Sequence, residues 1–323
     1  MATLKDIAHQ LNISTMTVSR ALNTPHLVKE ELRQQIQEVA KELDYKPNQA
    51  AKSLVSNKTG IIQVSISRNL DSTDPYFMTL LAGIADYLSE KFYSIIVRRD
   101  YEMINKCDGL IMMGLSKGED KEFYETLTVP TVLFGKTDYP IDYIDINNVQ
   151  GVRDITNYLI SLGHRHIGFV GMEYDEEFTK ERLDGYLLSL KENHIPIRSE
   201  YIINAKNHHI NAAKDVCQSL FENEEMTAIV CATDILALGI MEGVKEQGYN
   251  IPNDYSIVGF DGLYVNRLAV PHLTTVVQPL YEIGRDLGRV LLERIANEQK
   301  EKEEKIYDLK FCIGETTGSP RTK

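Results

Sequence analysis

Long apolar runs, paired cysteines and export signals are all missing from this sequence of 323 residues. No apolar run approaches the ~18 residues that a membrane-spanning helix needs. The N-terminal residues MATLKDIAHQ lack the apolar core of a signal peptide. The four cysteines are far apart and show no metal-ligand spacing. We therefore expect reduced thiols, no bound metal, no membrane contact and a cytoplasmic location.

Enzyme signatures are missing as well. The sequence has no GxSxG elbow, no Walker loop, no GxGxxG turn and no HExxH motif. Carboxylates such as Glu119 and Asp120 stand in a polar stretch typical of a solvated turn, not of a paired acid and base. The sequence therefore predicts a protein that is not an enzyme, with no catalytic residues and no cofactor.

Length and charge indicate a globular protein of more than one domain. A chain of this length predicts two or three domains, and its hydrophobic content of 43% is ordinary. Residues 1–60 contain eight Lys or Arg and six Asp or Glu, a net charge of +2, whereas the whole chain carries −12. A mildly basic head on an acidic body suits phosphate contact at one end only.

From residue 61 onward, apolar segments of strand length alternate with helical periods. The segments form two sets, 61–67, 93–98, 109–114, 129–135 and 143–146, then 166–171, 201–205, 228–232, 256–260 and 274–277. Nearly continuous apolar strands separated by helices indicate parallel sheets that are covered on both faces. We therefore predict two doubly wound subdomains. Because ligands in this architecture bind outside the carboxyl ends of the strands, the ligand site should lie between the subdomains.

The first 46 residues show the pattern of three short helices. Leu4, Ile7, Ala8 and Leu11 have the i, i+3, i+4, i+7 spacing of an amphipathic helix. A second helix follows after a tight turn, with Ser14 as its N-cap. Three such helices are typical of a helix-turn-helix unit whose second helix enters the DNA major groove. The pattern alone equally allows an ordinary three-helix bundle.

The second helix, in ISTMTVSRALN (13–23), has an unusual outer face. Helical periodicity turns Val18, Ala21 and Leu22 inward. The outer face has neither Glu nor Lys, which solvated helix faces favour. It consists of Thr15, Met16, Ser19, Arg20 and Asn23.

A series of motifs resembles the LacI/GalR family of bacterial repressors over nearly the whole chain. TLKDIAHQLNISTMTVSRALN and YKPNQAAKSL are similar to the DNA-binding head and hinge of that family. The other motifs are DPYF (74–77), DGLI (108–111), GHRHIGFVG (163–171), ERLDGY (181–186), ATDILALGIMEGVKEQGYNIPNDYSIVGFDG (232–262) and LTTVVQP (273–279). The resemblance implies a dimeric, effector-controlled transcription regulator whose core is similar to periplasmic sugar-binding proteins.

The resemblance also implies where the domains divide. The helix-turn-helix domain would cover residues 1–46, and a hinge helix and linker would cover 47–59. The core at 60–323 would bind the effector and dimerise. We expect its N-subdomain at about 60–146 and 279–305 and its C-subdomain at about 147–278 and 306–323.

In family terms, the helix at 15–23 is the recognition helix, and Thr15, Met16 and Arg20 match its base-reading positions. Arg20 can bond guanine O6 and N7 together, and Thr15 can bond either edge of the groove. Met16 can pack on a thymine methyl group, although it could also be a plain exposed apolar residue. The residues that would contact phosphates are Ser14, Thr17, Ser19 and Asn23.

The hinge, PNQAAKSL (47–54), is shorter than the ~12 residues that an isolated helix needs in water. We expect it to order only when two copies pack together on DNA. The resemblance implies that Leu54 wedges into the minor groove, whereas the pattern alone would make Leu54 a core residue. Lys52 would serve as a nearby phosphate or groove cation.

The effector residues are predicted from strand ends and from the resemblance. Arg182 matches a family arginine that bonds a ligand hydroxyl or carboxylate. Asp261 follows an apolar strand and could accept two bonds from a sugar diol, or merely cap a loop. Thr233 is preferred to Asp234, which could cap the next helix. The other predicted residues are Tyr76 and Phe77, as an apolar platform, and Gln278, at a crossover between subdomains.

Three departures from the family leave the sugar unidentified. Gly135 and Lys136 stand where many relatives have an acidic residue. KNHHIN (206–211) replaces an aromatic lid, and its two histidines, His208 and His209, fit surface residues better than ligands. The short loop at 98–111, together with DPYF, resembles the galactose and β-galactoside repressor branch.

The expected partners are a palindromic operator, a small sugar-like effector and a second copy of the chain. Because each head reads half a site, a two-fold homodimer would match the operator. No leucine heptad follows the core, so a dimer is expected and not a tetramer. Repression of a carbohydrate-utilisation operon is favoured over activation. The alternative is a sugar-binding protein of a transport system, which would need a signal peptide and no DNA-binding head.

Overall fold

The computed structural model describes residues 2–23, 27–43, 45, 58–66, 74–100, 102–104, 106–113, 124–173, 176–264 and 268–321. The chain divides into two compact units, residues 1–59 and 60–323. The predicted hinge at 47–54 lies outside the described residues. Within them, no helix combines the length and the apolar character needed to cross a membrane.

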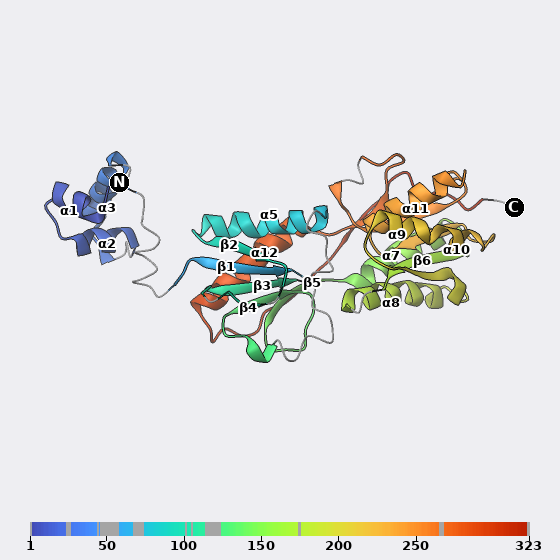
Figure 1. Ribbon diagram of the computed structural model, residues 1–323, viewed down its shortest axis with the longest axis horizontal. Coiled ribbons are helices and arrows are strands. Elements are labelled where there is room, and N and C mark those ends of the chain that lie inside the picture. Colours follow the sequence, from blue (N-terminus) through green and yellow to red (C-terminus); the bar gives the residue numbers. More distant parts are fainter. Residues whose placement is uncertain are drawn as a thin grey trace. The chain divides into compact units, whose positions relative to one another are not determined.

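The first unit contains three helices, α1 (Leu4–Gln10), α2 (Thr15–Asn23) and α3 (Glu30–Glu42), as the sequence predicted (Figure 1). Ser14 precedes α2, and its Oγ accepts a hydrogen bond from the Thr17 backbone N–H at 3.1 Å. The predicted N-cap is therefore confirmed. Asn12, in the tight turn before it, has a φ of 51°, a conformation that Asn adopts more readily than most residues.

The apolar faces of the three helices meet in one small core. The buried residues are Ile7, Ala8, Val18, Ala21, Ile36 and Val39. Leu22 is partly buried against this core, which confirms the predicted inward face of α2. The inner face of α2 packs in this core, whereas its outer face is exposed to solvent.

The second unit begins with a lobe built on a six-stranded sheet, which we call the first lobe. Its order is β11-β5-β4-β3-β1-β2, and every neighbouring pair is parallel. The strands are β1 (Ile61–Ile66), β2 (Ser94–Arg98), β3 (Gly109–Met113), β4 (Thr131–Phe134), β5 (Asp142–Ile146) and β11 (Glu304–Tyr307).

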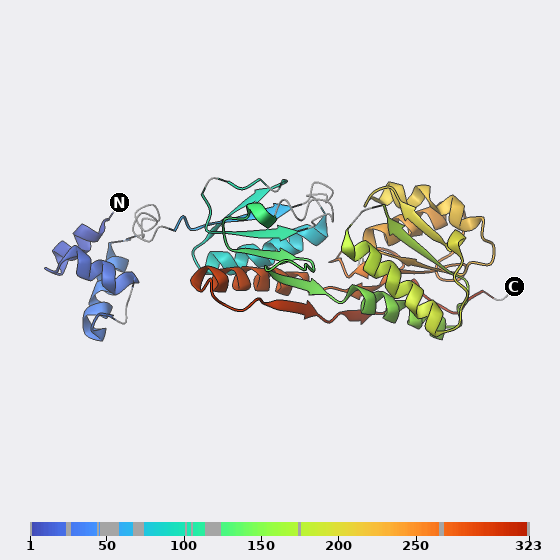
Figure 2. The ribbon, with the colours of Figure 1, turned by 90° about the horizontal axis from the view of Figure 1, so that it is seen from below.

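Two long helices, α5 (Pro75–Glu90) and α12 (Leu280–Ala296), pack side by side in the first lobe (Figure 2). Glycines allow this close approach: a Cβ on Gly83 would lie 2.1 Å from the Tyr281 carbonyl oxygen, and one on Gly284 would lie 2.2 Å from the Leu80 carbonyl oxygen. A separate apolar cluster buries Leu110, Met112, Leu133 and Tyr143 under Met103, Leu127, Val129 and Ile141.

The second lobe has a six-stranded sheet of order β12-β10-β9-β8-β6-β7. Its strands are β6 (Ile167–Met172), β7 (Ile202–Ala205), β8 (Ala228–Cys231), β9 (Ser256–Asp261), β10 (Thr274–Val277) and β12 (Lys310–Cys312). Helices α7 (Asn148–Ser161) and α8 (Glu177–Glu192) pack together, as do α9 (Ile210–Asp215), α10 (Cys217–Phe221) and α11 (Asp234–Glu246) (Figure 2). The predicted doubly wound class is confirmed.

The chain passes between the lobes after β5, after β10 and after β11. The last passage lies close to the boundary predicted at about 305, since strand β11 keeps Ile306 and Tyr307 in the first lobe. One strand departs from the predicted parallel sheets. Strand β12 is antiparallel to β10, because β10 runs out of the second lobe toward the cleft whereas β12 enters the lobe from it.

Candidate functional site

The outer face of α2 presents a small set of hydrogen-bonding and apolar groups to solvent. Thr15, Met16 and Arg20 are exposed, and Met16 exposes 62% of its surface. An apolar side chain this exposed is not part of the core of the head. The three predicted base-reading residues therefore lie on the side of α2 that faces away from the core.

The residues predicted to hold phosphates have more varied surroundings. The hydroxyls of Ser14 and Thr17 bond to each other at 2.8 Å, so one of their two protons remains to be donated elsewhere. Ser19 is partly buried. The Asn23 side chain, Lys52 and Leu54 lie outside the described residues, so their predicted roles stay predictions.

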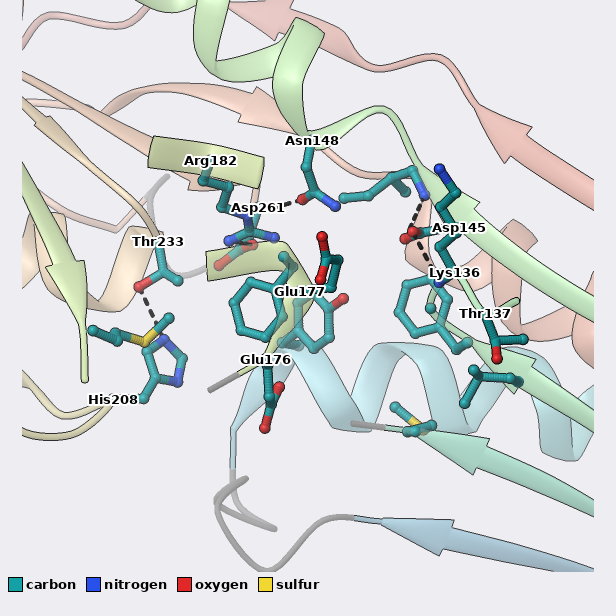
Figure 3. A pocket seen from close by; sticks show the side chains of 18 of the residues that line it. Lys136, Thr137, Asp145, Asn148, Glu176, Glu177, Arg182, His208, Thr233 and Asp261 are labelled. Carbon is teal, nitrogen blue, oxygen red and sulfur yellow. Dashed lines mark hydrogen bonds and ion pairs between the residues drawn. The ribbon is translucent and has the colours of Figure 1, made fainter. Parts of the chain in front are cut away.

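The core contains a cavity of about 430 Å³ between the carboxyl ends of its two sheets (Figure 3). Met113, Phe134 and Ile146, at the ends of β3, β4 and β5, line it from the first lobe. Met172 and Asp261, at the ends of β6 and β9, line it from the second lobe. The cavity is therefore where the doubly wound architecture predicts a ligand site.

Arg182 and Asp261 form a buried ion pair in the wall of this cavity. Arg182 Nη1 lies 3.5 Å from Asp261 Oδ1, and the two side chains expose only 4% and 3% of their surface. Arg182 Nε donates to Asn148 Oδ1 at 3.0 Å, and Nη1 donates to the Ala232 carbonyl at 2.6 Å. Its guanidinium carbon lies 4.0 Å from the Phe260 ring centroid. These contacts fix the plane of the guanidinium group before any ligand arrives.

Asp261 is held in an uncommon backbone conformation, with a φ of 136°. Residues other than glycine rarely adopt such a φ. Residues with strained backbone angles cluster at functional sites. Burial raises the pKa of the Asp261 carboxyl, and the positive charge of Arg182 opposes that rise. A ligand that donates hydrogen bonds would stabilise the carboxylate in place of the lost water.

Gln278 lies behind Asp261 and not in the cavity wall. Its Nε2 donates to Asp261 Oδ1 at 2.7 Å, and its Oε1 accepts from the Tyr76 hydroxyl at 3.3 Å. Tyr76 lines the cavity, but Gln278 is not among the lining residues. The prediction that Gln278 contacts the effector is therefore wrong for this geometry, and its amide instead orients the two residues that line the cavity.

Phe77 is also misplaced by the prediction. It is buried in the core, with 3% of its surface exposed, and shares one face of α5 with Leu80, Ile84 and Leu88. Neighbouring residues of a helix point about 100° apart. Tyr76 therefore faces the cavity while Phe77 faces the sheet, and only Tyr76 can form part of an apolar platform.

Thr233 lines the cavity, as predicted, but its hydroxyl already has two partners. It caps α11 by accepting from the Leu236 backbone N–H at 3.2 Å, and it bonds His208 Nε2 at 2.9 Å. Asp234, the rival candidate, is buried and accepts from the Leu263 N–H at 2.8 Å. The helix cap that was an alternative role for Asp234 is thus made by Thr233.

His208 lies in the cavity wall, against the expectation of a surface residue (Figure 3). Its Nδ1 is 3.2 Å from Asp74 Oδ2. His209, next in the chain, is exposed and accepts at Nδ1 from the Asn211 N–H at 3.4 Å. Both His208 and Asp74 were missed, although Asp74 stands in the DPYF motif beside Tyr76.

Asp145 is a second buried carboxylate in the cavity wall, from β5 of the first lobe. Its Oδ1 accepts from the Ile146 N–H at 2.8 Å and its Oδ2 from the Lys136 N–H at 3.1 Å. Burial raises the pKa of Asp145 to about 6. The sequence marks this residue as a carboxylate inside the otherwise apolar strand YIDI (143–146). Asp145 also lies next to Lys136, at the place where many relatives have an acidic residue and this chain has Gly135 and Lys136.

The raised pKa of Asp145 predicts a pH-dependent stability. The folded protein binds the Asp145 proton more tightly than the unfolded chain, in which the pKa of Asp is 3.8. Protonation of Asp145 therefore stabilises the fold below pH 4, and this stabilisation is lost as the pH rises through about 6. Asp145→Asn should therefore lose this pH dependence, which amounts to about 3 kcal/mol between pH 4 and pH 7. Because Asn has one acceptor oxygen for the two backbone N–H groups, the variant should be less stable than the wild type at pH 4 and should approach it at pH 7. Urea unfolding followed by circular dichroism measures the difference, and an equal difference at both pH values would contradict this explanation.

The chemistry of the cavity suits a polar ligand with an apolar face. Tyr76, Phe134 and Phe178 supply flat apolar surface, while Asp145, Arg182 and Asp261 supply acceptors and a donor. No group of three His, Cys, Asp or Glu side chains in the described part of the chain is placed to hold a metal ion. The arrangement resembles a binding site that reads hydroxyl groups and stacks on a ring.

Two family models match this chain. Residues 3–48 match the model of bacterial regulatory proteins, lacI family, and residues 156–317 match a periplasmic binding protein-like domain. The chain is 34% identical over 318 residues to the "Uncharacterized HTH-type transcriptional regulator YvdE" of Bacillus subtilis (strain 168). That match covers 98% of this chain and 100% of the relative.

Two solved structures extend the comparison. One is a LacI family transcriptional regulator from Enterococcus faecium with bound ribose, which is 26% identical to this chain and has a TM-score of 0.71. The match covers 80% of this chain and 99% of the chain in that structure. The lac repressor dimer bound to operator and the anti-inducer ONPF has a TM-score of 0.80 at 23% identity, over 98% of this chain and 99% of that one. The similarity to the lac repressor shows that the two chains have the same fold.

Proposed function

The chain belongs to the lacI family of bacterial regulatory proteins, and from this premise we propose that it is a cytoplasmic repressor of a carbohydrate-utilisation operon. It is a DNA-binding transcription regulator and not an enzyme. The match of residues 3–48 to a DNA-binding family counts against the alternative of a transport protein that only binds sugar. A small sugar-like effector, bound in the cavity between the lobes, would control the affinity for the operator.

The buried pair of Arg182 and Asp261 is the observation that carries the effector proposal. The pair places a charged donor and a charged acceptor in the cavity wall. The cavity volume of about 430 Å³ falls within the range of small-molecule sites, roughly 300–1,000 Å³. A carboxylate accepts bonds from two neighbouring hydroxyls, which is the pattern of a sugar diol. The related regulator from Enterococcus faecium holds ribose, which supports a sugar as the ligand class here.

The exposed face of α2 supports sequence-specific DNA binding. Arg20 would bond guanine, Thr15 a groove edge and Met16 a thymine methyl group. Ser14, Thr17, Ser19 and Asn23 would hold phosphates and fix the register. Lys52 and Leu54, outside the described residues, complete the proposal as a groove cation and a minor-groove wedge.

The first lobe offers apolar surface that a second copy of the chain would cover. Strand β2 is at the edge of its sheet, and its Ile96 and Val97 are exposed, as is Met78 on the neighbouring helix α5. Exposed apolar edge strands pair readily with another chain. A two-fold homodimer would place two heads on the half-sites of a palindromic operator.

Electrophoretic mobility shifts on the DNA upstream of the protein's own operon test the proposal. The full-length protein should shift that DNA in preference to a random fragment of equal length. One member of a panel of galactosides, glucosides and pentoses should change the shift. Equal binding to both DNAs would contradict the regulator role, and indifference to every sugar would contradict the proposed effector class.

A further inference from the structure

Three polar side chains with little exposed surface, Asp74, His208 and Thr233, link one lobe of the core to the other. Asp74 belongs to the first lobe and caps α5, accepting at Oδ1 from the Tyr76 N–H at 2.9 Å. His208 belongs to the second lobe, in the loop between β7 and α9. Asp74 Oδ2 lies 3.2 Å from His208 Nδ1, and the side chains expose 7% and 10% of their surface.

Thr233 holds the His208 ring from the side of the second lobe. Its Oγ1 accepts from the Leu236 N–H and bonds His208 Nε2 at 2.9 Å. When the imidazole carries a proton on Nδ1, that nitrogen can donate to Asp74 Oδ2, 3.2 Å away. Thr233, the N-cap of α11 in the second lobe, thus holds the Nε2 side of the imidazole. The Nδ1 side then points to Asp74 of the first lobe.

This contact differs from a second side-chain contact between the lobes, made by residues that the structure describes. Tyr76 bonds Gln278, which lies at a crossover where the chain itself joins the lobes. His208 lies in a loop of the second lobe that is not a crossover, so its distance to Asp74 is free to change when the lobes open. A hydrogen bond from an imidazole N–H to a carboxylate is stronger than one between neutral groups, so this contact would favour the closed spacing of the lobes.

We propose that Asp74 and His208 form a latch that holds the two lobes at their closed spacing around the effector cavity. His208 is the positioning residue, and Thr233 fixes its ring. The latch replaces the aromatic lid that KNHHIN lacks, because it closes the cavity with a polar contact of 3.2 Å to the opposite lobe. An effector that fits the closed cavity would then gain affinity from a latch that is already formed.

Distances between the lobes in the effector-free protein test the latch. Spin labels on Glu125→Cys in the first lobe and Gln218→Cys in the second, both exposed positions outside the cavity wall, report the spacing by pulsed electron resonance. Cys107 and Cys312 are changed to Ser. Cys217 and Cys231 are buried, and burial raises the pKa of Cys217 to about 12 and that of Cys231 well above its ordinary value, so they stay unlabelled. Labelled chains are diluted with unlabelled ones.

Two variants should open the lobes. Asp74→Ser keeps an N-cap for α5 but is too short to reach His208, and His208→Ala removes the ring. Each should lower the ratio of short to long distances about tenfold, the change that ~1.4 kcal/mol produces. The double variant should open the lobes no further than either single one.

Matched variants separate a latch from a general disturbance of the loop. His209→Ala, at the neighbouring exposed histidine, should keep the wild-type distances. His208→Asn should restore part of the short distance, because its amide N–H takes the place of Nδ1–H. Wild-type distances in His208→Ala, additive opening in the double variant, or His208→Asn no better than His208→Ala would each overturn the latch. The measurement needs no effector, so its failure would leave the proposed regulator function standing.

Discussion

Asp261→Asn should weaken effector binding by about 100-fold, because a hydrogen bond to a charged group contributes ~1.5–3 kcal/mol and a sugar diol makes two. Asn keeps the size of Asp and can still accept from Gln278 Nε2, which now lies 2.7 Å from Asp261 Oδ1. It loses the negative charge that pairs with Arg182 and one of the two acceptor oxygens. Operator binding should stay at the wild-type level, because residue 261 lies in the core and not in the head.

The measurement is calorimetry with the sugar that releases the wild type, followed by operator titration at increasing sugar concentration. The variant should remain on the operator where the wild type is released. Asp215→Asn, at the exposed end of α9, is the matched control and should respond as the wild type does. Wild-type sugar affinity in Asp261→Asn would mean that Asp261 only shapes its loop.

Arg20→Ala should lower the preference for operator over random DNA by about 5–150-fold, since one bidentate contact with guanine contributes roughly 1–3 kcal/mol. The side chain is exposed on the outer face of α2, so its loss leaves the core of the head intact. Effector binding should not change. Arg20→Lys should recover little, because an ammonium group does not reproduce the guanidinium fork.

Fluorescence anisotropy with operator and random duplexes, at one fixed salt concentration, measures the ratio of affinities. The matched control is Arg33→Ala. Arg33 lies on α3, where it bonds Glu30 at 2.5 Å, so its loss removes one cation from the same head without removing the proposed base contact. If Arg20→Ala weakened both duplexes equally, Arg20 would be a phosphate contact and not a base reader.

The sequence was sufficient for the elements and for the part of the site that lies at strand ends. The apolar segments of strand length indicated parallel strands, and their order placed Asp261 and Thr233 at the edge where ligands bind in this architecture. Strand β2 departs from the expected burial, since its Ile96 and Val97 are exposed. The apolar spacing in α2 left Thr15, Met16 and Arg20 on the outer face. These predictions rest on local periodicity, which the chain carries within a few residues.

Where the sequence failed, the deciding contacts join distant parts of the chain. A rotation of about 100° per residue along α5 put Tyr76 in the cavity and Phe77 in the core, and only packing against the sheet selects that rotation. The sequence does not reveal the place of His208, because its partners, Asp74 and Thr233, are far from it along the chain.

The sequence by itself determined the three helices of the head, the alternation of strands and helices in the core, and the acceptor and donor of the cavity. Only the tertiary structure decided that Gln278 lies behind Asp261, that β12 runs antiparallel to β10, and that Asp145 and His208 line the cavity. The reason is physical. A helical or strand period is fixed by neighbours along the chain, whereas the burial and bonding of a polar side chain depend on which lobe is packed against it.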